Sequence, residues 1–165
     1  MRLGRFLRHH LLPDWWVLRT FPKPVMSAIE QAIATSEQTH LGELRFVVEA
    51  NLPMHGLLRN QSARERAIEL FSRLGMWDTE HNSGVLVYVQ LLDRRVEIVA
   101  DRGIHARVGE AFWREICRRM EKAFREGQFK KGVLTALDEI TVVLSGHFPA
   151  NDDNPNELPD TPLIR

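Results

Sequence analysis

The sequence predicts an α/β sandwich, in which a small mixed β-sheet lies between layers of α-helices. Residues 85–89 (VLVYV) form a continuous run of β-branched and aromatic residues, which is typical of a strand buried on both faces. Residues 96–100 (VEIVA) alternate apolar positions with a charge, and the polar pair Asp93-Arg94 separates the two runs. Two strands joined by so short a turn form a β-hairpin. Segments with helical periodicity precede, separate and follow the predicted strands.

Length and composition indicate one domain flanked by two charged segments. A chain of 165 residues with 44% apolar content is long enough to bury one core. The 22 Lys and Arg residues equal the 22 Asp and Glu residues, so we expect no nucleic-acid partner, because such domains are usually strongly basic. The charge is uneven along the chain, however. We expect a basic and aromatic arm (residues 1–23), an α/β domain (24–148) and a flexible, acidic, proline-rich tail (149–165).

The N-terminal arm has two alternative interpretations. Four apolar residues of the arm share one helical face: Leu3, Phe6, Leu7 and Leu11. The arginines lie largely off that face, and the pair Trp15-Trp16 follows. A basic amphipathic segment of this kind could contact an anionic membrane surface. Alternatively, the arm packs on the domain, or on a second subunit in a homodimer. We expect packing, because the apolar stripe is short and the two tryptophans are large enough to anchor it by burial.

Before the hairpin, the pattern predicts a helix, a strand, a loop and a second helix. Residues 25–37 have helical spacing, with Pro24 suited to the first turn, and residues 44–50 alternate as a half-buried strand does. Pro53 and Gly56 mark residues 52–60 as a loop. Residues 61–74 form a helix that Gly75 ends in the left-handed conformation. Its expected inward residues are Ala67, Ile68, Phe71 and Leu74.

After the hairpin, two amphipathic helices complete the domain. Residues 109–126 have the clearest helical periodicity, and we expect Trp113 and Phe124 to be core residues and Gly127 to end the helix. Residues 131–145 form the last helix, ended by Gly146. Cys117 lies on the apolar face of its helix and is expected to be an unreactive core residue. As the one cysteine of the chain, it excludes an intrachain disulfide.

Polar residues crowd both ends of the hairpin, and hairpin geometry brings these two ends together. The first group precedes the first strand and the second follows the second strand: Asp78, Glu80, His81 and Asn82, then Asp101, Arg102 and His105. Oxygen ligands on converging loops suit calcium or magnesium, so we predict that a cation is held by Asp78, Glu80, Asn82 and Asp101.

The remaining three residues of these groups suit an anion instead. His81, Arg102 and His105, with backbone N–H groups near Gly103 at the start of a helix, could hold phosphate. The alternative to both sites is a set of solvated turn residues, with Asp101 and Arg102 as a surface ion pair.

Several classes of protein are excluded or disfavoured by motifs that the sequence lacks. There is no HExxH, CxxC, Walker glycine-rich loop or GxGxxG, and the histidines have no metal-ligand spacing. No apolar run approaches the ~20 residues that span a bilayer. The N-terminus does not resemble a signal peptide, because Arg8, His9 and His10 interrupt its apolar content. We therefore expect a cytoplasmic protein, or one peripheral to a membrane.

The hairpin and its flanks resemble the TPM domain family. The resemblance rests on Leu74-Gly75, then Asn82-x-Gly84-Val85-Leu86, the charged turn Asp93-Arg94-Arg95, and Val96-Glu97-Ile98 leading into Gly103. A later segment, Phe124-x-x-Gly127-x-Phe129-x-x-Gly132, also fits the family pattern, and the similarity spans about residues 24–148. The chain departs from the commonest pattern at Asp101-Arg102-Gly103, where many members have a glycine-rich turn, and at His81-Asn82-Ser83, where a double Asn is frequent.

The resemblance implies a fold and a range of functions. The family includes a thylakoid-lumen repair protein and membrane-anchored bacterial relatives. It implies the same α/β architecture, with a fourth short strand that the sequence does not locate. It also implies a binding or assembly module with a protein partner, associated with membrane-protein complexes and dependent on calcium or magnesium. The alternative that it implies is a weak metal-dependent phosphatase, with Asp78 and Asp101 as ligands and Arg102 or His105 holding phosphate.

Overall fold

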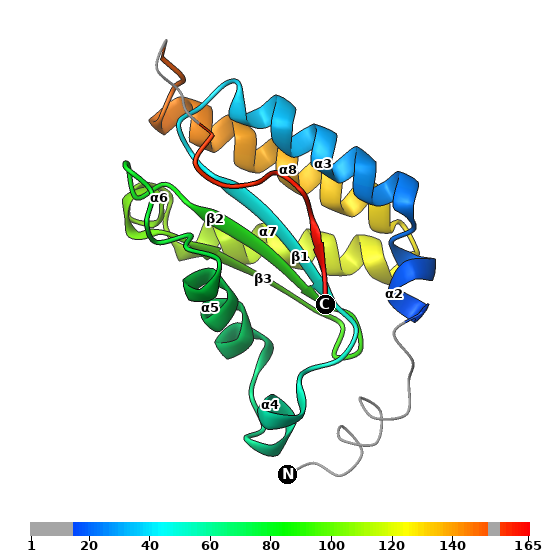
Figure 1. Ribbon diagram of the computed structural model, residues 1–165. Helices are drawn as coiled ribbons and strands as arrows, with labels where there is room; N and C mark the ends of the chain where they lie inside the picture. Colours follow the sequence, from blue (N-terminus) through cyan, green and yellow to red (C-terminus); the bar gives the residue numbers. More distant parts are fainter. Residues whose placement is uncertain (1–14, 152–155) are drawn as a thin grey trace.

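The computed structural model describes residues 15–151 and 156–165, which form a four-stranded sheet with helices on both faces (Figure 1). The strand order is β3-β2-β1-β4. Strands β1 and β2 are parallel, β3 is antiparallel to β2, and β4 is parallel to β1. Their bounds are Leu44–Glu49 (β1), Val85–Gln90 (β2), Arg95–Ala100 (β3) and Leu163–Ile164 (β4). The predicted mixed sheet and the predicted hairpin are confirmed, and β4 is the fourth strand that the sequence did not locate.

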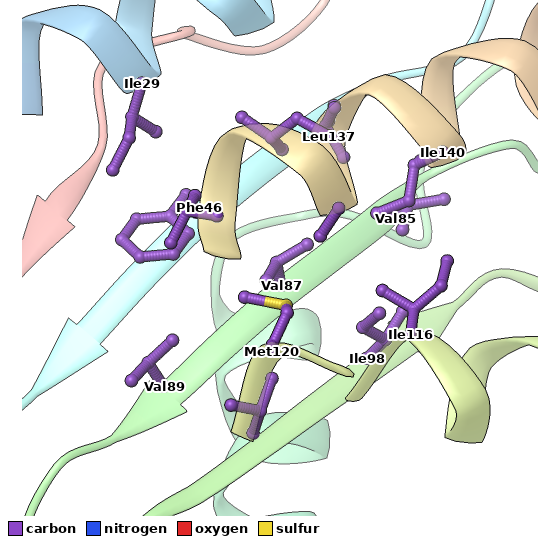
Figure 2. Packing of buried hydrophobic residues seen from close by; sticks show 14 of the residues in the cluster. Ile29, Phe46, Val85, Val87, Val89, Ile98, Ile116, Met120, Leu137 and Ile140 are labelled. Atoms are coloured by element: carbon purple, nitrogen blue, oxygen red, sulfur yellow. The ribbon is translucent and has the colours of Figure 1, made fainter. Parts of the chain in front are cut away.

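Four helices cover one face of the sheet and enclose the larger core. They are α2 (Trp15–Thr20), α3 (Lys23–Glu37), α7 (Glu110–Arg125) and α8 (Phe129–His147). Figure 2 shows how β-strand side chains meet helix side chains in this layer: Phe46, Val87 and Ile98 face Ile29, Ile116, Met120, Leu137 and Ile140. All of these side chains are buried, so their removal from water is a main source of stability.

The opposite face has a thinner cover, formed by α5 (Ala63–Arg73) and the C-terminal segment. Strand residues Leu86 and Tyr88 pack there against Leu70 of α5, and Leu158 and Leu163 of the C-terminal segment pack onto the same cluster. Short helices α4 (Met54–Leu58) and α6 (Arg102–Val108) complete the described elements.

Local signals explain where α5 begins and ends. Ser62 and Glu65 form a capping box, in which each side chain accepts a hydrogen bond from the other residue's backbone N–H. Gly75 follows the helix with a φ of +71°, which confirms the predicted left-handed stop. The expected inward position of Ile68 is wrong, because its side chain is 47% exposed.

The part of the N-terminal arm that the structure describes packs on the domain. Val17 and Phe21 are fully buried, and Trp16 packs against the larger core. The ring centroids of Phe21 and Phe46 lie 5.7 Å apart. Packing on the domain is therefore confirmed for this segment. Residues 1–14, which include Leu3, Phe6, Leu7 and Leu11, lie outside the described residues, as does the side chain of Trp15.

Four other expectations need correction. Strand β1 is buried at every position rather than half-buried, because helices and the C-terminal segment cover both of its faces. The predicted loop 52–60 contains helix α4. Helix α8 continues through Gly146 to His147. Residues 156–165 were expected to be flexible but include β4. This segment is held because β4 pairs with β1 and the Glu43 carboxylate accepts from the N–H groups of Glu157 and Leu158.

Candidate functional site

The two polar groups at the ends of the hairpin meet, as the sequence predicts. Val85 pairs with Ala100, so the start of β2 lies beside the end of β3. The backbone N–H of Asp101 donates to the carbonyl of Gly84 at 2.8 Å. The N–H of Ile104 donates to the carbonyl of Asn82 at 3.3 Å. These two hydrogen bonds hold the loop before β2 directly against the start of α6.

The loop that leads into β2 is held by a buried hydroxyl and by close backbone packing. The Thr79 side chain is buried, and its Oγ1 accepts from the backbone N–H of Ser83 at 3.2 Å. Asn82 has a φ of +52°, a conformation that asparagine tolerates better than most residues. At Gly84, a Cβ atom would lie 2.3 Å from the carbonyl oxygen of Met76. A side chain there would push the loop away from the strand.

Asp101 combines a capping role with an oxygen that has no partner. Its Oδ1 accepts from the backbone N–H of Arg102 at 2.7 Å and caps α6. Its Oδ2 is shielded from solvent and has no hydrogen-bond partner among the described residues. The carbonyls of His81 and Asn82 lie nearby against Gly103, where a Cβ atom would be 2.8 Å and 2.5 Å from their oxygens. Several oxygen atoms thus crowd the start of α6.

The other predicted metal ligands are gathered only in part. The Asn82 side-chain oxygen accepts from Nε of Arg102 at 3.0 Å, so these two residues are in direct contact. Asp78, Glu80 and His81 are exposed on the loop. Within the described residues, no three His, Cys, Asp or Glu side chains form a group that could hold a metal ion. A cation at this place would need backbone carbonyls, the Asn82 amide or water beside Asp101, which are ligands that calcium accepts.

His105 lies one helical turn after Asp101, and its backbone N–H donates to the carbonyl of Asp101 at 2.8 Å. It lines a polar groove of about 440 Å³ along the outer edge of β3, together with Arg64, Glu110 and Trp113. None of the other six predicted site residues lines this groove. Cys117 also lines it and is only half-buried, and burial raises the pKa of its thiol to about 12. The thiol is therefore protonated at neutral pH, but the expected core position is met only in part, because the side chain lines this groove.

A buried charged network, which the sequence did not predict, lies beneath α5. The Arg66 guanidinium donates to both carboxylate oxygens of Glu49, from Nε at 3.0 Å and from Nη2 at 2.6 Å. The Tyr88 hydroxyl donates to Oε2 of Glu49 at 2.8 Å. Burial, and then the charge of Glu49, raise the pKa of Tyr88. These bonds pair the buried charges of Arg66 and Glu49, so we interpret the network as structural. Removing either residue would leave the charge of the other buried and unpaired.

A second unpredicted cluster binds the C-terminal segment. The two carboxylate oxygens of Glu43 accept from the backbone N–H groups of Glu157 and Leu158, each at 3.0 Å. Arg45 donates to the carbonyl of Pro159.

Burial above all, with the nearby acids Glu43 and Asp160, raises the pKa of Glu37 to about 9. Glu37 is therefore protonated in the folded protein at neutral pH.

A buried histidine belongs to a hydrogen-bond network in which Ser36 connects α3 with α8. Nδ1 of His40 accepts from the backbone N–H of Gly42 at 3.2 Å, so Nε2 carries the proton and donates to Oγ of Ser36 at 2.7 Å. Ser36 in turn contacts Oγ1 of Thr141 at 2.6 Å. Burial lowers the pKa of His40 to about 4, which keeps its ring neutral. No spacing in the sequence indicated this network, because Ser36 and Thr141 come from helices far apart in the sequence and His40 follows the end of α3.

The described helices are too short or too polar for any of them to cross a bilayer.

Comparison with known proteins agrees with the fold that the structure shows. The family model of the TPM domain matches residues 20–143. No curated protein matches the chain significantly.

Several solved structures share the fold, and two of them are similar over most of the chain. The chain is similar to the NMR structure of the BA42 protein from the psychrophilic bacterium Bizionia argentinensis, with 29% identity and a TM-score of 0.74; the match covers 86% of this chain and 93% of that one. It is also similar to the N-terminal domain of a protein from P. gingivalis, with 16% identity and a TM-score of 0.63, covering 83% and 90% of the two chains.

Proposed function

Since the chain belongs to the TPM domain family, we propose that it is a binding and assembly module that acts at membrane-protein complexes and depends on calcium or magnesium. The proposed cation lies at the start of α6, where the Asp101 carboxylate supplies the charge. The proposed partners are a protein and, through the arm residues Arg2, Arg5 and Arg8, an anionic membrane surface.

The unpartnered oxygen of Asp101 is the observation that carries this proposal. A shielded carboxylate oxygen without a hydrogen bond is costly, and a bound cation would satisfy it. Asn82 and the carbonyl of His81 supply further oxygens, and the exposed Asp78 and Glu80 on the same loop would add negative charge. Because few carboxylates surround the site and Arg102 is adjacent, we expect weak binding, with a Kd of about 1 mM, as in extracellular calcium modules.

Thermal unfolding tests the cation site. At 10 mM calcium, about ten times this Kd, binding to the folded state alone should add roughly 1.4 kcal/mol of stability. For a chain of this size the Tm should rise by about 3–5 °C. Asp101→Asn should abolish the shift, since asparagine still caps α6 but lacks the charge. The matched control is Asp138→Asn on the exposed surface of α8, which should keep it. Equal shifts in wild type and Asp101→Asn, or none at 10 mM, would refute the site.

The same variants separate the module from the alternative of a weak phosphatase. A module should not hydrolyse an aryl phosphate, with or without added magnesium. Cation-dependent hydrolysis that copurifies with the protein and falls in Asp101→Asn would instead assign an enzymatic role to this site.

A further inference from the structure

A small apolar hollow lies at the opposite end of the sheet from the candidate site. It has a volume of about 250 Å³, and its lining residues belong to β2, the β2–β3 turn, α2, α7 and α8. Figure 1 shows where these elements lie in the fold. Its apolar walls come from four elements and the turn: Trp16, Val89, Leu91, Phe124 and Phe129. Concave sites with apolar walls and a few polar groups are typical of small-molecule binding.

The aromatic walls of the hollow are fixed by their own packing. The ring centroids of Phe124 and Phe129 lie 5.0 Å apart. Phe21, fully buried behind them, contacts both rings at 6.2 Å and 5.8 Å. A wall held in this way is formed before a ligand arrives, which lowers the entropic cost of binding.

The polar side of the hollow is strongly cationic. Arg94, Arg95 and Arg125 line it, and Glu121 is the one acidic residue among its lining residues. Glu121 already accepts from the backbone N–H of Val96 at 3.2 Å and lies 4.0 Å from Arg95. Among the described residues, no ion pair involves Arg94 or Arg125. The hollow therefore offers positive charge beside an aromatic surface.

We propose that this hollow binds a small apolar molecule with one anionic group, such as a medium-chain or aryl carboxylate. The size agrees, because an apolar cavity of about 150 Å³ holds benzene and this hollow is larger. The charge agrees as well, since a carboxylate would be the counter-ion of Arg94 and Arg125. The segment that precedes Trp15 in the sequence would be a less suitable occupant, because Arg2, Arg5 and Arg8 would be repelled by the cationic side of the hollow. This inference is independent of the cation site.

Three ligands with one chain length and different head groups test the proposal on the full-length protein. Octanoate, octanol and octylamine would each be titrated and followed by amide NMR shifts. Octanoate should give saturable shifts at Val89 and Leu91, and should bind more tightly than octanol. Octylamine should not bind, and added salt should weaken octanoate binding. Equal affinity for all three ligands, or no saturable shift with millimolar octanoate, would overturn the proposal.

Arginine variants test the charge separately from the fold. Arg94→Asn combined with Arg125→Gln should weaken octanoate binding about fivefold to tenfold, because two exposed ion pairs are lost. Asparagine is chosen since position 94 has a φ of +53°. The control, Arg73→Gln with Arg118→Gln, removes two exposed arginines away from the hollow and should leave affinity unchanged. Equal weakening in both double variants would overturn the proposal, as would binding to phosphatidylglycerol vesicles without binding of octanoate.

Discussion

The pH dependence of folding should show the effect of His40. Its pKa is about 4 in the folded protein, against 6.5 for an ordinary histidine, because the ring is fully buried. As the pH falls below 6.5, the unfolded chain binds a proton before the folded one does. The stabilising contribution of neutral His40 is thus complete above pH 6.5 and decreases by up to about 3 kcal/mol as the pH approaches 4.

Urea unfolding between pH 7 and pH 4.5 measures this contribution. His40→Asn keeps an acceptor for Gly42 at the position of Nδ1, loses the donor to Ser36 and does not titrate, so the variant is less stable at pH 7 but its stability should fall less with pH than that of wild type. The exposed His55 gives the control, and His55→Asn should follow the wild-type curve. Parallel curves for wild type and His40→Asn would mean that the ring is already protonated, or accessible to water, in the folded state.

Two tryptophans allow a direct test of core packing. Trp113 is 3% exposed, so Trp113→Ala should lower the free energy of unfolding by about 3–5 kcal/mol. Trp77 is 58% exposed, and Trp77→Ala should change it by no more than about 0.5 kcal/mol. Denaturant unfolding of both variants gives the comparison. A loss below about 1 kcal/mol at position 113 would contradict the buried position of this side chain.

At the scale of elements, β4 depends on the carboxylate that binds the segment before it. Glu43→Gln replaces one acceptor by a donor that faces the N–H groups of Glu157 and Leu158, which should cost about 1–3 kcal/mol. The C-terminal segment should then detach more often. Hydrogen exchange should therefore become faster at Ala50 and Arg165, whose N–H groups form hydrogen bonds between the chain ends that follow β1 and β4 and their partner strand.

The expected change in exchange is local. Val87, in the centre of β2, should exchange as slowly as in wild type when the overall stability is taken into account. The exposed Glu126→Gln variant serves as the control and should leave Ala50 unchanged. Unchanged exchange at Ala50 in Glu43→Gln would show that β4 does not depend on Glu43.

The elements that the sequence predicted are those with long periodic patterns. Helix α7 has apolar residues at helical spacing and strand β2 has a continuous apolar run, each over most of its length. The family resemblance implied the same architecture. Helix α4 has five residues after Pro53, and β4 has two, so neither is long enough for a period to be recognised. Tertiary hydrogen bonds, which a linear pattern does not contain, hold β4 in place.

At the scale of the whole molecule, the positions of candidate site residues could be predicted only where the pairing of two strands determines them. A hairpin places Asn82 beside Asp101 and Arg102, and the structure confirms their proximity. It does not determine how the loop before β2 is arranged, so the exposed positions of Asp78 and Glu80 could not be derived. The buried pair of Glu49 and Arg66 was missed because alternation along a strand suggests an exposed charge.

The position of β1 in the sheet has a consequence for the order of folding. Its two neighbours are β2 and β4, and Val47 pairs with Tyr88 on one side and with Leu163 on the other. Contacts between residues so far apart in sequence form slowly, because a long loop must close first. Until Leu163 arrives, the unpaired edge of β1 is a template for the strand of another molecule. Refolding at high protein concentration should therefore favour aggregation at this edge, and the rate at which β4 docks should limit the yield of native protein.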